Sequence, residues 1–133
     1  MRRSVVLVLL LLLGACGLRS VQEPEDDVPG ETVRLKQRES AMVTTTLIKV
    51  EFIGATDSRC PSDVQCIQAG EAAIVVVFSG AGADRMDTLH LGPQPVAAVY
   101  GGYRFEAVAL DPYPKSTGTS GDKVLSLRVT AAH

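Results

Sequence analysis

Two cysteines, Cys60 and Cys66, lie close together in the segment DSRCPSDVQCIQAG, residues 57–70. Zinc sites often use two cysteines about two to four residues apart, and dithiol redox centres typically use Cys-x-x-Cys. Here five residues separate the pair, and the two histidines, His90 and His133, are distant in the sequence. A cysteine nucleophile needs an imidazole partner and a free thiol. The pattern therefore disfavours a zinc site, a redox centre and a catalytic thiol.

A structural disulfide between Cys60 and Cys66 is the interpretation that remains. An exported protein enters an oxidising compartment, where neighbouring cysteines pair. Closing so short a loop stabilises the fold by about 2.4 kcal/mol in the loop-entropy model. We therefore expect this pair to fix the shape of a loop.

The residues between and after the cysteines also suggest a short helix. Ser62, with Gln65 three residues later, fits a capping box, and Asp63 would lie in the first turn. Gly70 can adopt the left-handed conformation that ends such a turn. The segment 61–70 is therefore predicted to form one or two helical turns.

Two chemical alternatives remain open for this region. Asp57, Asp63 and Glu71 could gather oxygen ligands for calcium, although their spacing is not that of an EF-hand. A hydrolase would need a cluster of titratable groups, but no Gly-x-Ser-x-Gly elbow is present. His90 is expected as a surface or half-buried strand residue. We expect no cofactor, no metal and no enzymatic activity.

A non-enzymatic interaction module is the favoured function. Functional residues are often carried on loops that a rigid scaffold positions. The candidate contact residues are polar side chains of the cysteine loop and of a later loop: Asp57, Arg59, Asp63, Gln65 and Gln68, with Asp111 and Tyr113. The expected partner is an envelope protein or a protease whose cleft accepts the loop.

The N-terminus is predicted to be a bacterial lipoprotein signal peptide, residues 1–16. Arg2 and Arg3 precede the apolar run of residues 5–13, which is too short to span a bilayer as a final anchor. LGAC follows and resembles a lipobox, which implies a diacylglycerol on the thiol of Cys16 and an acyl chain, such as palmitate, on the new amine. Two or three chains anchor stably because each buried CH₂ contributes about 0.8 kcal/mol. We expect a protein anchored to the membrane by lipid.

The segment that follows, residues 17–30, is acidic, carries two prolines and is expected to be a flexible tether. As a coil its 14 residues would reach on the order of 20 Å. Loss of residues 1–16 leaves 11 Lys and Arg against 15 Asp and Glu, which argues against nucleic-acid binding. The expected location is the cell envelope, on the periplasmic face of the outer membrane if the cell has two membranes.

The rest of the chain, residues 31–133, has the pattern of strands. Ile48, Val50 and Phe52 alternate with polar residues, which predicts a strand with one buried face. The run from Ile74 to Phe78 has no alternation and predicts a central strand buried on both faces. GAGAD, residues 80–84, is expected to be a hairpin turn, and residues 111–122 a loop. The expected strands lie at 31–36, 44–54, 71–80, 85–92, 103–110 and 123–131.

About six or seven strands separated by turn residues, with no long helix, predict an all-β fold. An antiparallel β-sandwich of immunoglobulin-like size fits this spacing best, with a small β-barrel as the alternative. The chain has no Trp and three Phe, so its core must be mainly aliphatic.

DSRCP, the second cysteine and AGEA before an apolar strand resemble a pattern in small bacterial envelope lipoproteins. The similarity continues into YRFEAVALDPYP and the closing strand, and so covers most of residues 31–130. This chain has Gln68 where that pattern has an aromatic residue, expected to be Trp. The resemblance implies no activity, but it suggests that the loop matters beyond its local fold.

Overall fold

The computed structural model describes residues 30–118 and 121–133, and in this part of the chain every regular element is a strand. No helix there is long and apolar enough to cross a membrane. The predicted signal peptide, with Cys16, and residues 17–29 of the tether lie outside the described residues. The strands are β1 (Glu31–Lys36), β2 (Ser40–Val43), β3 (Ile48–Asp57), β4 (Ala72–Ser79), β5 (Arg85–Leu91), β6 (Ala98–Tyr100), β7 (Tyr103–Asp111) and β8 (Val124–Ala131).

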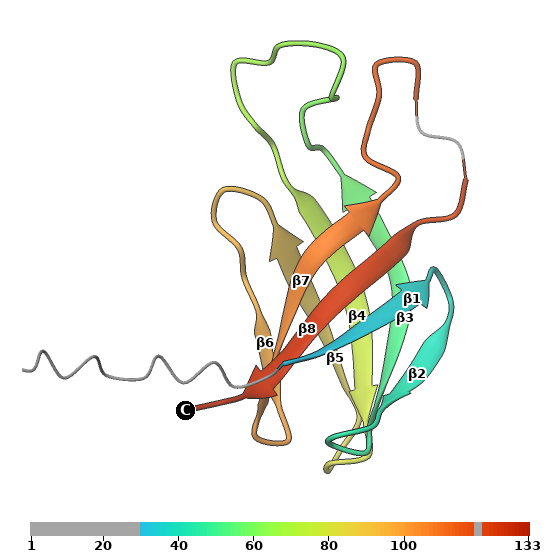
Figure 1. Ribbon diagram of the computed structural model, residues 1–133, viewed down its shortest axis with the longest axis vertical. Helices are drawn as coiled ribbons and strands as arrows, with labels where there is room; N and C mark the ends of the chain where they lie inside the picture. The colour runs from blue at the N-terminus through green and yellow to red at the C-terminus, as the bar shows by residue number, and fades with distance from the viewer. Residues whose placement is uncertain (1–29, 119–120) are drawn as a thin grey trace, which may run out of the picture.

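The strands form two four-stranded sheets that stack face to face (Figure 1). The first sheet has the order β1-β8-β7-β6 and the second the order β2-β3-β4-β5, and every pairing is antiparallel. The sheets do not close on each other, so the predicted sandwich is confirmed and the barrel alternative is wrong.

The core lies between the sheets and is built from alternate residues of the strands. On β3, Ile48, Val50 and Phe52 all point inward and are at most 1% exposed, as the alternation predicted. Phe78 is the aromatic centre, because its ring centroid lies 4.5 Å from that of Phe105 and 5.5 Å from that of Tyr100. The remaining buried positions are almost all aliphatic, which agrees with the low aromatic content of the chain.

The described residues form eight strands, and the two that the sequence did not predict are the short edge strands β2 and β6. β2 has four residues and β6 has three, too few for a period of two to stand out. Gly101 and Gly102, both at positive φ, make the tight turn that joins β6 to β7. The expected hairpin turn at residues 80–84 is confirmed. The loop expected at residues 111–122 is confirmed from residue 112, because Asp111 is the last residue of β7.

The apolar strand β4 lies inside its sheet, between β3 and β5, as predicted, but it is not buried on both faces. Ile74, Val76 and Phe78 are fully buried in the core, whereas Val75 and Val77 are partly exposed on the outer face. The prediction of double burial is wrong because no helix or further sheet of the described chain covers this antiparallel sheet. An antiparallel sheet can leave one face to solvent.

The two ends of the sandwich have different roles. At one end the chain enters at Glu31, opposite Val129, and the described chain also finishes there (Figure 1). Here the Glu31 carboxylate accepts hydrogen bonds from the backbone and hydroxyl groups of Thr44 and Thr45 and so ties the two sheets together. Hydrogen bonds from Thr45 and then Thr44 lower the pKa of Glu31 to about 2. The long loops extend from the opposite end.

The two faces of β4 give a matched test of the fold. Val76→Ala should lower the free energy of unfolding by about 2 kcal/mol, because it empties space in a closed core. Val77→Ala should cost less than about 1 kcal/mol, because its side chain is already partly in water. Urea unfolding of both variants measures the difference, and equal losses would contradict the one-sided burial.

Candidate functional site

Two loops lie side by side at the far end of the sandwich (Figure 1). The first, residues 58–71, joins β3 to β4 and is called the stapled loop here because it carries the disulfide. The second, residues 112–123, joins β7 to β8 and is called the late loop. Because β3 and β7 belong to different sheets, contacts between these loops also connect the two sheets.

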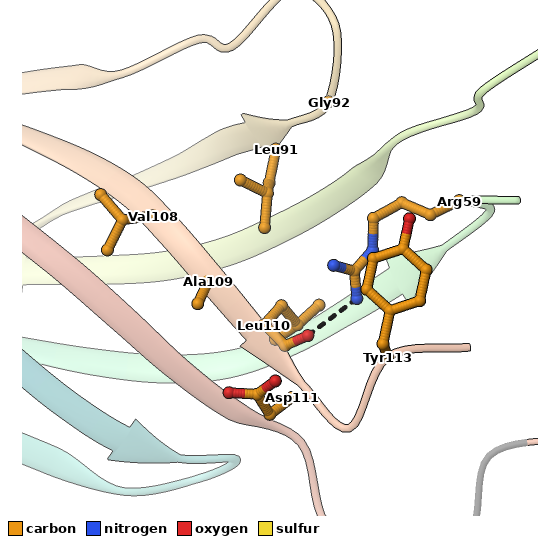
Figure 2. Close-up of a pocket in the computed structure, with 8 residues that line it drawn as sticks. All are labelled: Arg59, Leu91, Gly92, Val108, Ala109, Leu110, Asp111 and Tyr113. Carbon is orange, nitrogen blue, oxygen red and sulfur yellow. Dashed lines mark hydrogen bonds between the residues drawn. The ribbon is translucent and has the colours of Figure 1, made fainter. Parts of the chain in front are cut away.

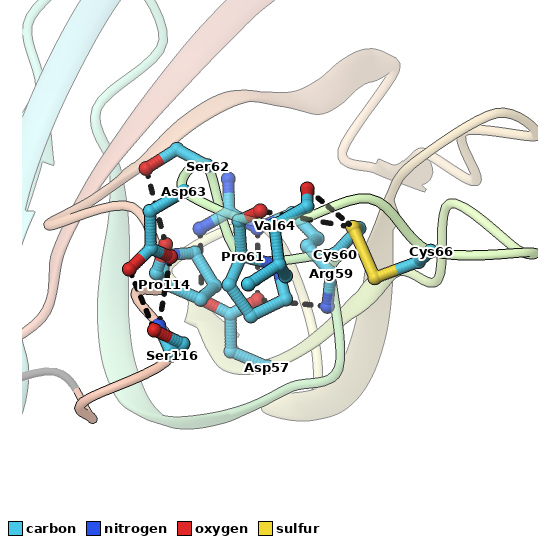
Figure 3. The surroundings of a disulfide bond; sticks show 10 residues. All are labelled: Asp57, Arg59, Cys60, Pro61, Ser62, Asp63, Val64, Cys66, Pro114 and Ser116. Atoms are coloured by element: carbon cyan, nitrogen blue, oxygen red, sulfur yellow. Dashed lines mark hydrogen bonds and ion pairs between the residues drawn. A yellow bond between two sulfur atoms is a disulfide. The ribbon is translucent and has the colours of Figure 1, made fainter.

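The predicted disulfide between Cys60 and Cys66 is confirmed, with the two Cα atoms 5.9 Å apart (Figure 3). Between the disulfide and the sheet, the first and last residues of the stapled loop are joined by backbone hydrogen bonds. The N–H of Ser58 donates to the carbonyl of Glu71 at 2.9 Å, and the N–H of Cys60 donates to the carbonyl of Ala69 at 2.7 Å. The disulfide therefore closes the part of the loop beyond a hydrogen-bonded neck.

Gly70 is required at this neck. Its φ is +64°, in the left-handed region expected from the sequence. A Cβ atom built here would lie 1.9 Å from the carbonyl oxygen of Ser58, so no other residue fits without moving the backbone.

The helical turns predicted for residues 61–70 are absent, and this prediction is wrong. One turn forms, in which the N–H of Val64 donates to the carbonyl of Pro61 at 3.3 Å. Ser62 of the expected capping box and Asp63, which was expected in the first turn, bind the late loop instead (Figure 3). The N–H of Ser62 donates to the carbonyl of Pro114 at 3.0 Å, and the Asp63 carboxylate accepts from the N–H and hydroxyl of Ser116 at 2.8 and 2.6 Å. These long-range hydrogen bonds engage the Ser62 N–H and the Asp63 carboxylate, which were expected to lie in the first turn of a local helix.

Asp57, the last residue of β3, holds the bases of both loops together. Its Oδ1 and Oδ2 accept from Nε and Nη2 of Arg59, each at 2.8 Å, and Oδ2 also accepts from Nζ of Lys123 at 2.8 Å. Nη2 of Arg59 donates further to the carbonyl of Leu110 on β7, and Nζ of Lys123 to that of Pro112. One carboxylate thus connects β3, the stapled loop, β7 and the late loop.

The charges of this cluster stabilise one another. Burial alone would raise the pKa of Asp57, but the hydrogen bonds from Arg59 and Lys123 outweigh it and lower the pKa to about 2. The hydrogen bonds to Asp57 raise the pKa of Arg59. The guanidinium carbon of Arg59 also lies 4.3 Å from the ring centroid of Tyr113, a cation–π contact. The side chains of Asp57 and Arg59 are only 7% and 8% exposed, so this pair is part of the fold.

A hollow of about 360 Å³ opens at the root of the two loops, between the ends of β5 and β7 (Figure 2). Arg59 and Asp111 lie at its border, with the late-loop residue Tyr113. The other lining residues are mainly apolar: Leu91, Gly92, Val108, Ala109 and Leu110. Sequence reasoning missed this hollow because it combines strands of different sheets.

The structure separates the predicted contact residues into two groups. Asp57 and Arg59 are buried in the ion cluster, and Asp63 is bonded to the late loop. Gln65 and Gln68 are exposed, and so are Asp111 and Tyr113. Between the two glutamines the structure adds Ile67, which is fully exposed at 105%.

Val64 is 46% exposed, and the exposure of Ile67 and Val64 had no signal in the sequence, because Ile and Val are among the residues most often buried. The segment 64–68, called the tip here, therefore presents two apolar side chains and two amides to solvent.

The three carboxylates considered for calcium have different partners. Asp57 binds Arg59 and Lys123, Asp63 binds Ser116, and Glu71 lies 3.1 Å from Nδ1 of His90. Within residues 30–118 and 121–133 no three His, Cys, Asp or Glu residues are grouped as a metal ion would require. His90 is half-buried on β5, as expected.

The geometry thus defines a β-sandwich domain with one disulfide-closed loop docked against a second loop. No protein-family model matches the chain, and neither a curated protein nor a solved structure does. The resemblance to small envelope lipoproteins therefore stays a prediction from the motif.

The role of Asp57 can be tested by its dependence on pH. Because folding lowers its pKa from 3.8 to about 2, Asp57 stabilises the fold above pH 4, and this contribution is lost as the pH falls towards 2. Asp57→Asn should cost about 2 kcal/mol at pH 7, and the difference from wild type should shrink between pH 4 and pH 2. Urea unfolding at each pH measures it.

Asp87→Asn is the matched control, because Asp87 pairs with Arg85 on the surface, where both side chains are at least 32% exposed. It should cost less than about 1 kcal/mol. If the two variants lose the same stability, or if the Asp57→Asn difference does not change with pH, the buried cluster does not have the role assigned to it.

Proposed function

We propose that this protein is a lipid-anchored envelope protein that binds a partner protein through the tip of its stapled loop, without catalysis. The observation that carries this proposal is the exposure of Ile67 and Val64 on a loop that is held rigid. The disulfide, the hydrogen-bonded neck and the contacts with the late loop all restrain it.

Rigidity and exposure together favour binding. An apolar side chain gains free energy when a partner removes it from water. A loop that is already ordered loses little conformational entropy when it binds. The amides of Gln65 and Gln68 flank Ile67 and can exchange hydrogen bonds with polar groups around an apolar pocket. The partner that this tip fits is a protein with a small apolar pocket and a polar rim.

The position of the loop supports presentation to a partner. The chain leaves the described domain towards Cys16 at Gly30, at the end of the sandwich opposite the stapled loop (Figure 1). A lipid on Cys16 would hold that end near the membrane, so the loop lies at the end remote from the anchor.

The residue at position 68 agrees with this role. The lipoprotein pattern that the chain resembles has an aromatic residue there, and Gln68 lies on the exposed tip beside Ile67. Large aromatic side chains are frequent anchors at the centre of interfaces. A change at this position would alter which partner is bound rather than the stability of the domain.

The binding role can be tested by photo-crosslinking in intact cells. A photoreactive amino acid at position 67 should give a discrete adduct, and the same residue at position 86 should not. Met86 is the matched control because it is also apolar and 65% exposed, but it lies on the outer face of β5. Purified partner should bind Ile67→Asp at least tenfold more weakly than wild type and Met86→Asp equally well. No adduct at position 67, or equal effects of the two Asp variants, would overturn the proposal.

The anchor can be tested separately. Growth with an alkyne fatty acid should label the wild-type chain, and mass spectrometry should locate the lipid on Cys16. Cys16→Ser should lose the label and stay in an uncleaved form. A wild-type chain cleaved elsewhere and free of lipid would overturn the anchoring.

A further inference from the structure

The outer face of the first sheet carries a row of basic side chains. Arg34 lies on β1, Arg128 on β8 and Arg104 on β7, and all three are exposed. Arg128 is opposite Thr32 and Glu106, so Arg34 and Arg104 are its diagonal neighbours on either side. Diagonal neighbours on adjacent strands, on one face of the sheet, are about 7–8 Å apart. With Lys36 at the end of β1, these residues are called the basic face.

The basic side chains of this face outnumber its acids. None of the four basic side chains forms an ion pair with a carboxylate of the described chain. Two acids share this face by register: Glu106 is opposite Arg128, and Asp111 at the end of β7 is opposite Val124. At one corner the Glu39 carboxylate accepts a hydrogen bond from the backbone N–H of Lys36. The chain as a whole has a formal charge of −2, so the basic face is a positively charged patch on a protein of net negative charge.

The outer face of the second sheet has a different character. Val75 and Val77 of β4 are partly exposed there, next to Met86 of β5. On β3 the charges alternate in sign, with Lys49 and Glu51. The outer faces of the two sheets therefore differ in charge, and the first carries more basic than acidic side chains.

The N-terminal segment enters at the edge of the basic face. A Cβ atom built on Gly30 would lie 3.0 Å from Thr130 and 3.1 Å from Cγ of Arg128, so Gly30, the first described residue, lies directly beside Arg128. Only 13 residues separate Gly30 from Cys16, the predicted lipid site. A coil of that length reaches on the order of 20 Å, which keeps this face close to any membrane that holds Cys16.

We propose that the basic face docks the domain on the anionic headgroups of the membrane that anchors it. This inference rests on the anchoring part of the proposed function and adds the orientation of the domain. Basic residues near an anionic bilayer attract it by about 1 kcal/mol each, an attraction that salt screens. With the first sheet on the lipid, the second sheet faces away, and the tip at the end of the sandwich stays accessible.

The test uses the full chain, purified with its lipid and placed in bilayer nanodiscs that contain a paramagnetic headgroup lipid. In discs with phosphatidylglycerol, backbone amides of β1, β7 and β8 should be broadened more than those of β4 and β5. The difference should disappear in phosphatidylcholine discs and at high salt. R104E/R128E should abolish it as well.

K49E/K115E is the matched control, because it makes the same change in net charge at two exposed residues outside the basic face. It should keep the wild-type pattern. Uniform broadening of both sheets, broadening centred on β4 and β5, or equal effects of the two double variants would overturn the docking. A broadening pattern that is the same in phosphatidylglycerol and phosphatidylcholine discs would also overturn the docking. This holds even if the basic face binds another polyanion, such as an acidic polysaccharide, in a separate binding assay.

The mass of the purified chain separates this inference from the anchor. If Cys16 carries no lipid, the anchoring part of the proposed function fails, and the basic face is then tested by sedimentation of the chain with vesicles. Anionic vesicles should bind wild type and K49E/K115E about tenfold or more better than R104E/R128E. Equal sedimentation of the three proteins would overturn the docking independently of the anchor.

Discussion

The far end of the molecule depends on one carboxylate. Asp57 receives hydrogen bonds from Arg59 and Lys123, which in turn donate to backbone carbonyls at the end of β7 and the start of the late loop. Removing one member of such a buried group leaves an uncompensated charge, which costs far more than an exposed pair contributes. This cluster makes two loops from different sheets behave as one unit.

Because the two loops are joined by hydrogen bonds, the polar residues of the stapled loop fall into two groups. Those at its base are used inside the protein, and those at its tip remain available. Arg59 and Asp63 are conspicuous in the sequence, but the first is buried and the second is bonded to Ser116. The disulfide joins two cysteines that are six positions apart in the sequence. Ile67, the residue after the second cysteine, is fully exposed. The scaffold holds the loop, and the tip is the part that remains exposed to solvent.

The two proposals place different surfaces of the sandwich in different surroundings. The tip, with its apolar and amide groups, suits a protein pocket, because apolar burial and a few directed hydrogen bonds give specificity. The basic face suits a surface of spread negative charge, because its arginines lie on three neighbouring strands with few acids among them. One domain can use both at once, since one lies at an end and the other on a side.

The sequence by itself determined the class of fold, most strands and the disulfide. Alternation such as that of Ile48, Val50 and Phe52 reports burial directly, and two nearby cysteines leave few possible partners. It did not determine β2 and β6, whose three or four residues are too few to show a period. Nor did it place Ser62 and Asp63, because a capping box is a local signal, and bonds to residues about 50 positions away replaced it. The ion cluster and the basic face were decided only by the tertiary structure, since each combines residues that lie far apart in the sequence. The tip is one continuous segment, but only the tertiary structure decided that its apolar side chains face solvent.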